Sequence, residues 1–136
     1  MVILALDTTT RAGSAALMRG AEVVAVQASD AARPQAERLP AELMALLDRY
    51  GLELPQIDLY AVATGPGSFT GLRIGIATMQ GLALAQGKPL IGISAFDALA
   101  WTADRQTGSY TAPVATWVDA WRGGMRTSRT GFTAGH

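Results

Sequence analysis

Apolar positions in the first part of the chain fall into short, closely spaced runs. Residues 2–6 are all apolar, which is typical of a strand buried in a sheet. Residues 13–18 and 21–27 are two further short runs, and an Arg-Gly pair suited to a tight turn lies between them. The pattern predicts three consecutive strands that pair antiparallel as a meander.

Longer stretches with helical periodicity follow. Residues 37–50 place four leucines and a tyrosine on one face, which predicts an amphipathic helix. Pro40 is expected in the first turn of this helix, where its missing N–H costs little. A second helix is predicted at 70–86, ended by Gly87. The other predicted elements are strands at 59–63 and 90–93 and a short helix at 95–103, and residues 113–118 could form a sixth strand.

This order of elements predicts an α/β fold in layers. Strands after the first helix should run parallel to the first strand, through right-handed crossovers. We therefore expect a mixed five-stranded sheet with helices on its faces, formed by residues 1–118. The ribonuclease H-like fold, shared with the actin-like ATPases, has this order of elements.

The end of the chain has a different composition. Residues 119–136 contain no Val, Leu or Ile, but four Gly and three Arg. Such a segment contributes little to a core, and we expect a loose, disordered tail.

Composition excludes several classes of protein. The chain has 136 residues, zero net charge and no cysteine, and its one histidine is His136. A disulfide framework, a thiolate metal site, a cysteine nucleophile and a histidine-based triad are therefore excluded. The arginines form no dense run with interleaved aromatic residues, so direct binding of nucleic acid is not expected. The start lacks a basic signal-peptide region and no stretch is long enough to span a membrane, so we expect a cytoplasmic protein.

Asp7, Thr8 and Thr9 are the first candidates for chemistry, because they follow the first buried strand. A carboxylate there could hold a hydrated metal ion, and the threonine hydroxyls could line a phosphate. The simpler interpretation is a polar turn, in which Asp and Thr bond their own backbone. These residues alone favour the polar turn.

Segment 64–71 joins a predicted buried strand to the start of a helix. Ser68 or Thr70 can cap that helix, and free N–H groups there favour anions. The segment matches neither of the common glycine-rich phosphate-binding patterns. Its glycines are equally explained by the backbone demands of a sharp corner.

The helix predicted at 70–86 contains glycines in its interior. Gly75 and Gly81 each cost about 1 kcal/mol relative to alanine. They are explained if another helix, in the same chain or in a second protein, packs very close. Arg73 and Gln80 share one face of this helix, which is either solvated or the rim of an interface.

Several segments together resemble the TsaB family, also called YeaZ. The resemblance extends over residues 1–104 and, more loosely, 113–122, and the segment GPGSFTGLRIG at 65–75 is the most specific part of it. The other segments that carry the resemblance are 3–10, 35–39, 80–83 and 91–94.

The resemblance implies a role in forming N6-threonylcarbamoyladenosine at position 37 of tRNAs that read codons beginning with A. It implies a catalytically silent partner of the paralogue TsaD, working with the ATPase TsaE, so that tRNA and ATP with Mg²⁺ are used by the complex. A homodimer is a further implication. The residues implied at the partner interface are Glu37, Arg38, Gly71, Arg73, Gly75 and Gln80.

Two departures from the family pattern change these expectations. Gln35 stands where family members commonly carry a histidine. The family also has a second, smaller lobe, which is missing here, so we expect a truncated or frameshifted frame that binds no nucleotide alone. The alternatives are an actin-like nucleotide-binding module or a non-functional fragment. A metallopeptidase is disfavoured, because the histidine pair of TsaD is absent.

Overall fold

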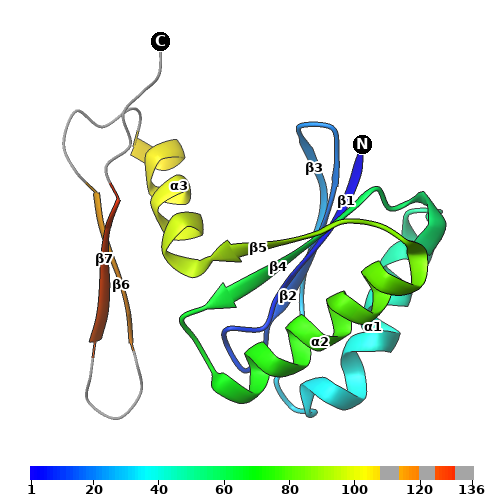
Figure 1. The fold of residues 1–136 in the computed structure, drawn as a ribbon, viewed down its shortest axis with the longest axis horizontal. Helices are drawn as coiled ribbons and strands as arrows, with labels where there is room; N and C mark the ends of the chain where they lie inside the picture. Colours follow the sequence, from blue (N-terminus) through cyan, green and yellow to red (C-terminus); the bar gives the residue numbers. More distant parts are fainter. Residues whose placement is uncertain (108–113, 120–124, 131–136) are drawn as a thin grey trace.

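The computed structural model describes residues 1–107, 114–119 and 125–130. A sheet carries α1 and α2 on one side, and α3 leads from its end to a separate pair of strands (Figure 1). The elements in chain order are β1 (Val2–Asp7), β2 (Ser14–Arg19), β3 (Glu22–Ala28), α1 (Gln35–Arg49), the short 3-10 helix η1 (Leu54–Gln56), β4 (Leu59–Gly65), α2 (Phe69–Gln86), β5 (Leu90–Ser94), α3 (Ala95–Thr107), β6 (Val114–Asp119) and β7 (Met125–Thr130).

The main sheet has five strands in the order β3-β2-β1-β4-β5. Strands β1, β2 and β3 form an antiparallel meander, and β4 and β5 run parallel to β1. Each parallel connection contains a helix, as a crossover between parallel strands requires. The sequence-based prediction of a mixed five-stranded sheet with a ribonuclease H-like arrangement is confirmed.

The core lies between the sheet and the layer of α1 and α2. Alternate residues of β1, Leu4 and Leu6, are buried on this side, together with Leu17 of β2. The leucines of α1 and Met79 of α2 meet them there. Burial of these side chains fixes the positions of α1 and α2 on the sheet. It thereby also positions the loops that join these helices to the strands.

Helix α1 begins earlier than the sequence pattern predicts. It starts at Gln35, so Pro40 is inside the helix and not in its first turn, and that prediction is wrong. Pro40 has no N–H to donate to the carbonyl of Ala36, which makes it a weak site in the helix interior. The burial of the leucine stripe compensates, because most helical stability in proteins comes from such packing.

Helix α2 begins one residue before its predicted start at 70 and ends at Gln86 as the sequence predicts. The Oγ of Ser68 accepts a hydrogen bond from the N–H of Gly71 at 3.2 Å, so Ser68 is the N-cap. Gly87 ends the helix in the left-handed conformation, with a φ of 62°.

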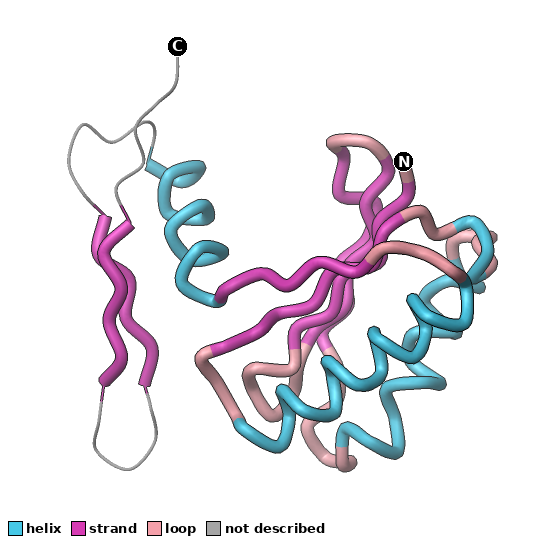
Figure 2. Tube along the Cα trace, in the orientation of Figure 1, coloured by secondary structure: helices cyan, strands magenta, loops and turns pink. Residues whose placement is uncertain are grey.

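The C-terminal part contains a second, two-stranded sheet. Strands β6 and β7 pair antiparallel, and α3 lies between them and the main sheet (Figure 2). The sequence predicts a tail without regular structure over 119–136, whereas residues 125–130 of that segment form β7. Pairing of backbone groups with β6 needs no aliphatic side chain, which is why composition did not reveal it. Residues 120–124 and 131–136 lie outside the described part.

Candidate functional site

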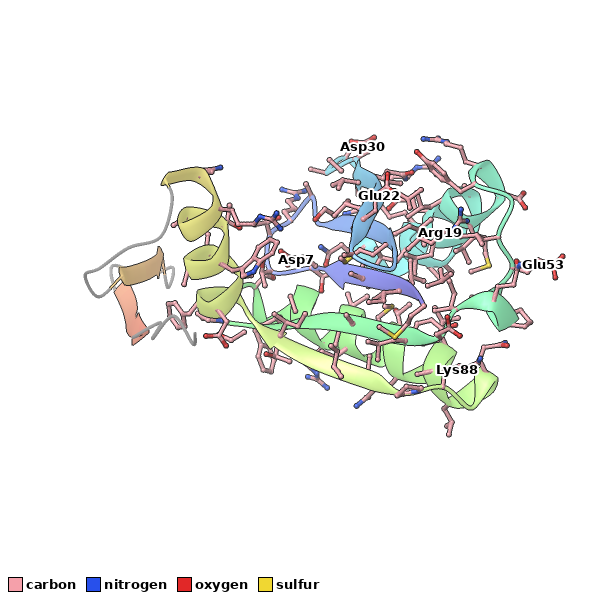
Figure 3. All side chains as sticks on the ribbon, turned by 90° about the horizontal axis from the view of Figure 1, so that it is seen from above. Asp7, Arg19, Glu22, Asp30, Glu53 and Lys88 are labelled. Atoms are coloured by element: carbon pink, nitrogen blue, oxygen red, sulfur yellow. The ribbon has the colours of Figure 1, made fainter. Side chains whose placement is uncertain are left out.

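The β1–β2 turn, residues 8–13, lies at the carboxyl end of β1, beside the starts of α1 and α2. Asp7 stands at the end of the sheet that faces α3 (Figure 3). Its Oδ1 accepts a hydrogen bond from the N–H of Thr9 at 2.8 Å. The Oγ1 of Thr10 accepts one from the N–H of Gly13 at 3.2 Å. These bonds are those of a polar turn, the interpretation that the sequence favours.

Thr8 is fully buried beneath α2. A Cβ on Gly71 would overlap the carbonyl oxygen of Thr8, and a Cβ on Gly75 would overlap its hydroxyl. A glycine in the interior of a helix is explained if a neighbour packs very close. For Gly75 this neighbour is the β1–β2 turn of the same chain. Gly71 and Gly75 are buried by this contact, so their side of α2 is not exposed to another protein.

The loop before α2 closes over the same turn. The N–H of Ser68 donates to the carbonyl of Thr9 at 2.8 Å. A Cβ on Gly67 would lie 2.5 Å from the Cβ of Thr9. The N–H groups of Ser68 and Thr9 are therefore used within the chain, and these residues present no free cradle for a phosphate.

Arg38 ties α1 to the turn and is only 4% exposed. Its Nη2 donates to the carbonyl oxygens of Arg11 at 3.0 Å and Ala12 at 2.6 Å. Its Nε donates to the carbonyl of Arg33, and its Nη1 pairs with Glu42 at 3.0 Å. The guanidinium is thus engaged inside the chain.

Gln35 strengthens the same connection. Its Nε2 donates to the carbonyl of Thr10 at 2.9 Å and lies 3.3 Å from that of Arg11. Glu42 also accepts a bond from the Oγ of Ser29 at 2.6 Å. Sequence reasoning missed these contacts, although the spacing of Arg38 and Glu42, one helical turn apart, was a signal for an ion pair.

The outward side of α1 and α2 holds the remaining interface candidates. Glu37, Arg73 and Gln80 are exposed there. The guanidinium of Arg73 lies 5.4 Å from the centre of the Phe69 ring, close enough for a cation–π contact. Exposed apolar residues, among them Met44 and Leu84, lie on the same two helices. We define the α1–α2 surface as Glu37, Met44, Arg73, Ala77, Gln80, Gly81 and Leu84.

A cavity of about 1510 Å³ opens at the carboxyl ends of β1, β4 and β5. Its lining combines the β1–β2 turn, the start of α2 and one side of α3, including Asp7, Ser68 and Leu99. No group of three or more His, Cys, Asp or Glu side chains that could hold a metal ion occurs among the described residues. Within the same part of the chain, no helix is long and apolar enough to cross a membrane.

Comparison with known proteins places these features in a family. A family model described as TsaD, tRNA N6-adenosine threonylcarbamoyltransferase, matches residues 21–130. The tRNA threonylcarbamoyladenosine biosynthesis protein TsaB of Escherichia coli is 40% identical over 109 residues, which are 80% of this chain and 47% of that protein. The chain belongs to the TsaB/YeaZ family. It spans about half the length of the curated relatives that it matches.

Solved structures agree. A protein from Pseudomonas aeruginosa, described as uncharacterized with similarity to peptidase YEAZ, superposes with a TM-score of 0.84 and 34% identity. The match covers 98% of this chain and 60% of that one. RuvC of Thermus thermophilus has a TM-score of 0.50 at 14% identity over 84% of each chain, and shows the fold alone.

Three of the segments that carry the family resemblance meet in one place. The turn after β1, the first residues of α1 and the glycine-rich start of α2 are far apart in the sequence but contact one another. The family model also matches beyond Arg122, up to residue 130. The buried residues of these three segments thus contact one another, whereas Glu37 and Arg73 of the same segments lie exposed on the α1–α2 surface.

Proposed function

We propose that the chain is a non-catalytic partner of a TsaD-like protein in the formation of N6-threonylcarbamoyladenosine at position 37 of tRNAs that read codons beginning with A. Membership in the TsaB/YeaZ family supports the process, since the Escherichia coli relative is named for it. The TsaD family match supports a partner of related fold. This chemistry belongs in the cytoplasm, with the tRNA held by the complex.

The observation that carries the partner role is Gly81. It lies in the interior of α2, where glycine costs about 1 kcal/mol relative to alanine. Apart from its two chain neighbours and the backbone of its own helix, no described atom lies within 4 Å of the position that its Cβ would take. Gly75 has an internal reason to be glycine, and Gly81 has none among the described residues. A close-packed helix from a partner supplies such a reason, because small residues let two helices approach.

The exposed apolar side chains around Gly81 fit the same role. Leu84 is 85% exposed and Met44 is 39% exposed. Charged and polar residues surround them, as in the rim of a protein interface. We therefore infer an interface that contains Glu37, Arg73 and Gln80 together with Gly81, Leu84 and Met44. The buried residues Arg38, Gly71 and Gly75 are not part of this interface.

The hydrogen bonding and burial of Asp7 and Thr8, at the start of the β1–β2 turn, support the non-catalytic role. The Oδ1 of Asp7 accepts a hydrogen bond from the N–H of Thr9. The Oγ1 of Thr8 is buried against α2 and has no hydrogen-bond partner among the described residues, so a ligand cannot reach it from solvent. ATP and Mg²⁺ are then requirements of the complex, which includes a TsaE-like ATPase. A homodimer of this chain is a separate assembly.

The test is co-purification with the TsaD-like protein of the same source, followed by size exclusion with light scattering. We expect a heterodimer with the wild-type chain and at least about tenfold weaker binding with Gly81→Leu, since its side chain blocks close approach. Gly81→Ala should stabilise the free chain by about 0.5–1 kcal/mol in urea denaturation and bind more weakly than wild type.

Gln106→Leu is the matched control, because it places an exposed leucine on α3, away from the α1–α2 surface. It should bind as the wild type does. Equal binding by Gly81→Leu and wild type would remove this surface from the proposal, and a folded chain that ignores the TsaD-like protein would overturn the partner role itself.

A further inference from the structure

Helices α1 and α2 cover one face of the main sheet, and α3 stands at the end of β5 (Figure 1). The covered face buries Leu4, Leu6 and Leu17. Neighbouring residues of the same strands point to the opposite face. We call this opposite face the open face and define it as Ala5, Ala16, Val26, Ala61, Ile91 and Ile93.

The middle of the open face is made of small residues. The register places one row of side chains across all five strands, in the order Val26, Ala16, Ala5, Ala61 and Ile91. The register shifts of the β2–β3 and β4–β5 ladders both fall outside this row. Three alanines therefore form a hollow between larger side chains on the two edge strands.

The larger side chains of the open face lie in solvent. Val26 is 71% exposed, Ile91 44% and Ile93 39%. A single exposed apolar residue is normal, whereas a continuous apolar patch indicates a binding surface. The row of alanines joins these side chains into one patch.

The size of the hollow fits an α-helix. The backbones of β3 and β5 are four strand spacings apart, about 19 Å, and a helix with its side chains is about 10–12 Å across. The hollow is part of the cavity of about 1510 Å³ described above, and sites for small molecules have volumes of about 300–1,000 Å³. A helix therefore fits the space better than a small molecule does.

Two cations stand at the end of the cavity formed by the carboxyl end of β1. Arg11 and Arg33 are exposed there and line the cavity. Within the described part of the chain, their guanidinium groups have no hydrogen bond or ion pair. Asp7 is the only acidic residue in the described lining, and its Oδ1 accepts a hydrogen bond from the N–H of Thr9. This end of the cavity therefore favours a negatively charged partner.

We propose that the open face binds an amphipathic helix of another protein, with acidic residues in the turn that meets Arg11 and Arg33. The apolar side of the helix fills the hollow between Val26 and Ile91. Acidic residues are favourable in the first turn of a helix, so the bound helix begins at the carboxyl end of β1. The open face lies on the other side of the sheet from the α1–α2 surface, so this proposal does not depend on the TsaD-like partner.

The probe is a synthetic, fluorescently labelled peptide of about 16 residues, since about 13 helical residues match the length of β1. It carries leucines along one face and glutamates in its first turn. Fluorescence anisotropy with the full chain should give a dissociation constant of about 10 µM or lower. A second peptide with lysines in place of the glutamates should bind at least about tenfold more weakly.

A charge exchange tests the two arginines. The double variant Arg11→Glu/Arg33→Glu should bind the lysine peptide more tightly than the glutamate peptide, because the charges at the contact are reversed. Arg19→Glu/Arg49→Glu is the matched control. It changes the net charge equally, at exposed arginines that do not line the cavity, and should keep the wild-type preference.

A second pair of variants tests the apolar contact. Val26→Glu/Ile91→Glu should weaken binding of the glutamate peptide at least about tenfold, since it places charges on both sides of the hollow. Met44→Glu/Leu84→Glu makes the same change on the α1–α2 surface and should bind as the wild type does. Far-UV circular dichroism establishes that each variant is folded, and the arginine exchange decides the question if Val26→Glu/Ile91→Glu is not.

The proposal is overturned if the glutamate peptide does not saturate the chain up to about 300 µM. Equal binding by a peptide of the same composition with its leucines spread around the helix overturns it as well. Loss of binding in Met44→Glu/Leu84→Glu alone would place the peptide on the α1–α2 surface. A wild-type dimer in sedimentation equilibrium that Val26→Glu/Ile91→Glu dissociates would mean that a second copy covers the open face, which also overturns the proposal.

Discussion

Tyr60 lies in the middle of the core, and its side chain is fully buried. Its hydroxyl has no hydrogen-bond partner among the described residues. An unpaired buried hydroxyl costs free energy, so Tyr60→Phe should raise the free energy of unfolding by about 1 kcal/mol. Urea denaturation measures this change. Tyr50→Phe, at a partly exposed position, should change it by less than about 0.5 kcal/mol.

The pH dependence of the same variant has a defined sign. Burial raises the pKa of Tyr60 above its ordinary value of 10.0. Above about pH 10 the unfolded chain loses the phenolic proton while the folded chain keeps it, so stability falls as pH rises. Tyr60→Phe lacks this loss, and its advantage over wild type should grow from neutral to alkaline pH. A constant difference would mean that the hydroxyl is solvated in the folded chain.

Single residues differ in how far the sequence reveals their roles. Gly87 could be assigned as the end of α2 and Ser68 as one of two candidate N-caps, because capping is a local property of the chain. The cost of Gly75 in a helix was also visible, but not its neighbour. Thr8 meets Gly75 only through the tertiary fold, and no spacing in the sequence encodes that contact.

Between elements, the buried side chain of Arg38 forms a link with several hydrogen bonds. It connects α1 to carbonyl groups of the β1–β2 turn and to Glu42. Arg38→Met should lower the free energy of unfolding by about 3 kcal/mol, because it leaves buried polar groups without partners. Thermal or urea unfolding measures the loss.

Two further variants make the Arg38 prediction specific. Arg38→Lys keeps the charge but lacks the planar fork that reaches several carbonyls, so it should recover only part of the loss. Arg49→Met, at the exposed end of α1, should have little effect. Equal losses at positions 38 and 49 would mean that the turn is held mainly by Gln35 and α2.

Most elements could be predicted from periodicity, and the exceptions have physical causes. The leucines of α1 and the apolar run of β1 report burial directly, so their elements were placed correctly. The start of α1 at Gln35 and the position of Pro40 could not be read, since helix ends depend on contacts such as the bond from Gln35 to Thr10. Strand β7 was missed because backbone pairing leaves little trace in composition.

The whole molecule combines a five-stranded sheet with a two-stranded one. An isolated two-stranded hairpin is marginally stable in water. Backbone amides of β6 and β7 should therefore exchange with deuterium at least about a hundredfold faster than those of β1 and β4, which have neighbours on both sides. Hydrogen exchange followed by mass spectrometry measures this ratio. Similar protection in both sheets would make them one cooperative unit.

The shape of the molecule also separates two kinds of surface. The α1–α2 surface presents side chains of a helix layer, whereas the edge of β5 presents backbone groups. Sequence reasoning pointed to the first surface from the interior glycines of α2, but could not predict the second, since the exposure of an edge depends on strand order.

The contact between Thr8 and Gly75 limits which substitutions this sequence can accept during evolution. The hydroxyl of one residue fills the space that a methyl group on the other would need. A methyl gained at position 75 is tolerated only if an atom is lost at position 8. The residue accepted at position 75 thus depends on the size of the side chain at position 8, although the two positions belong to different motifs.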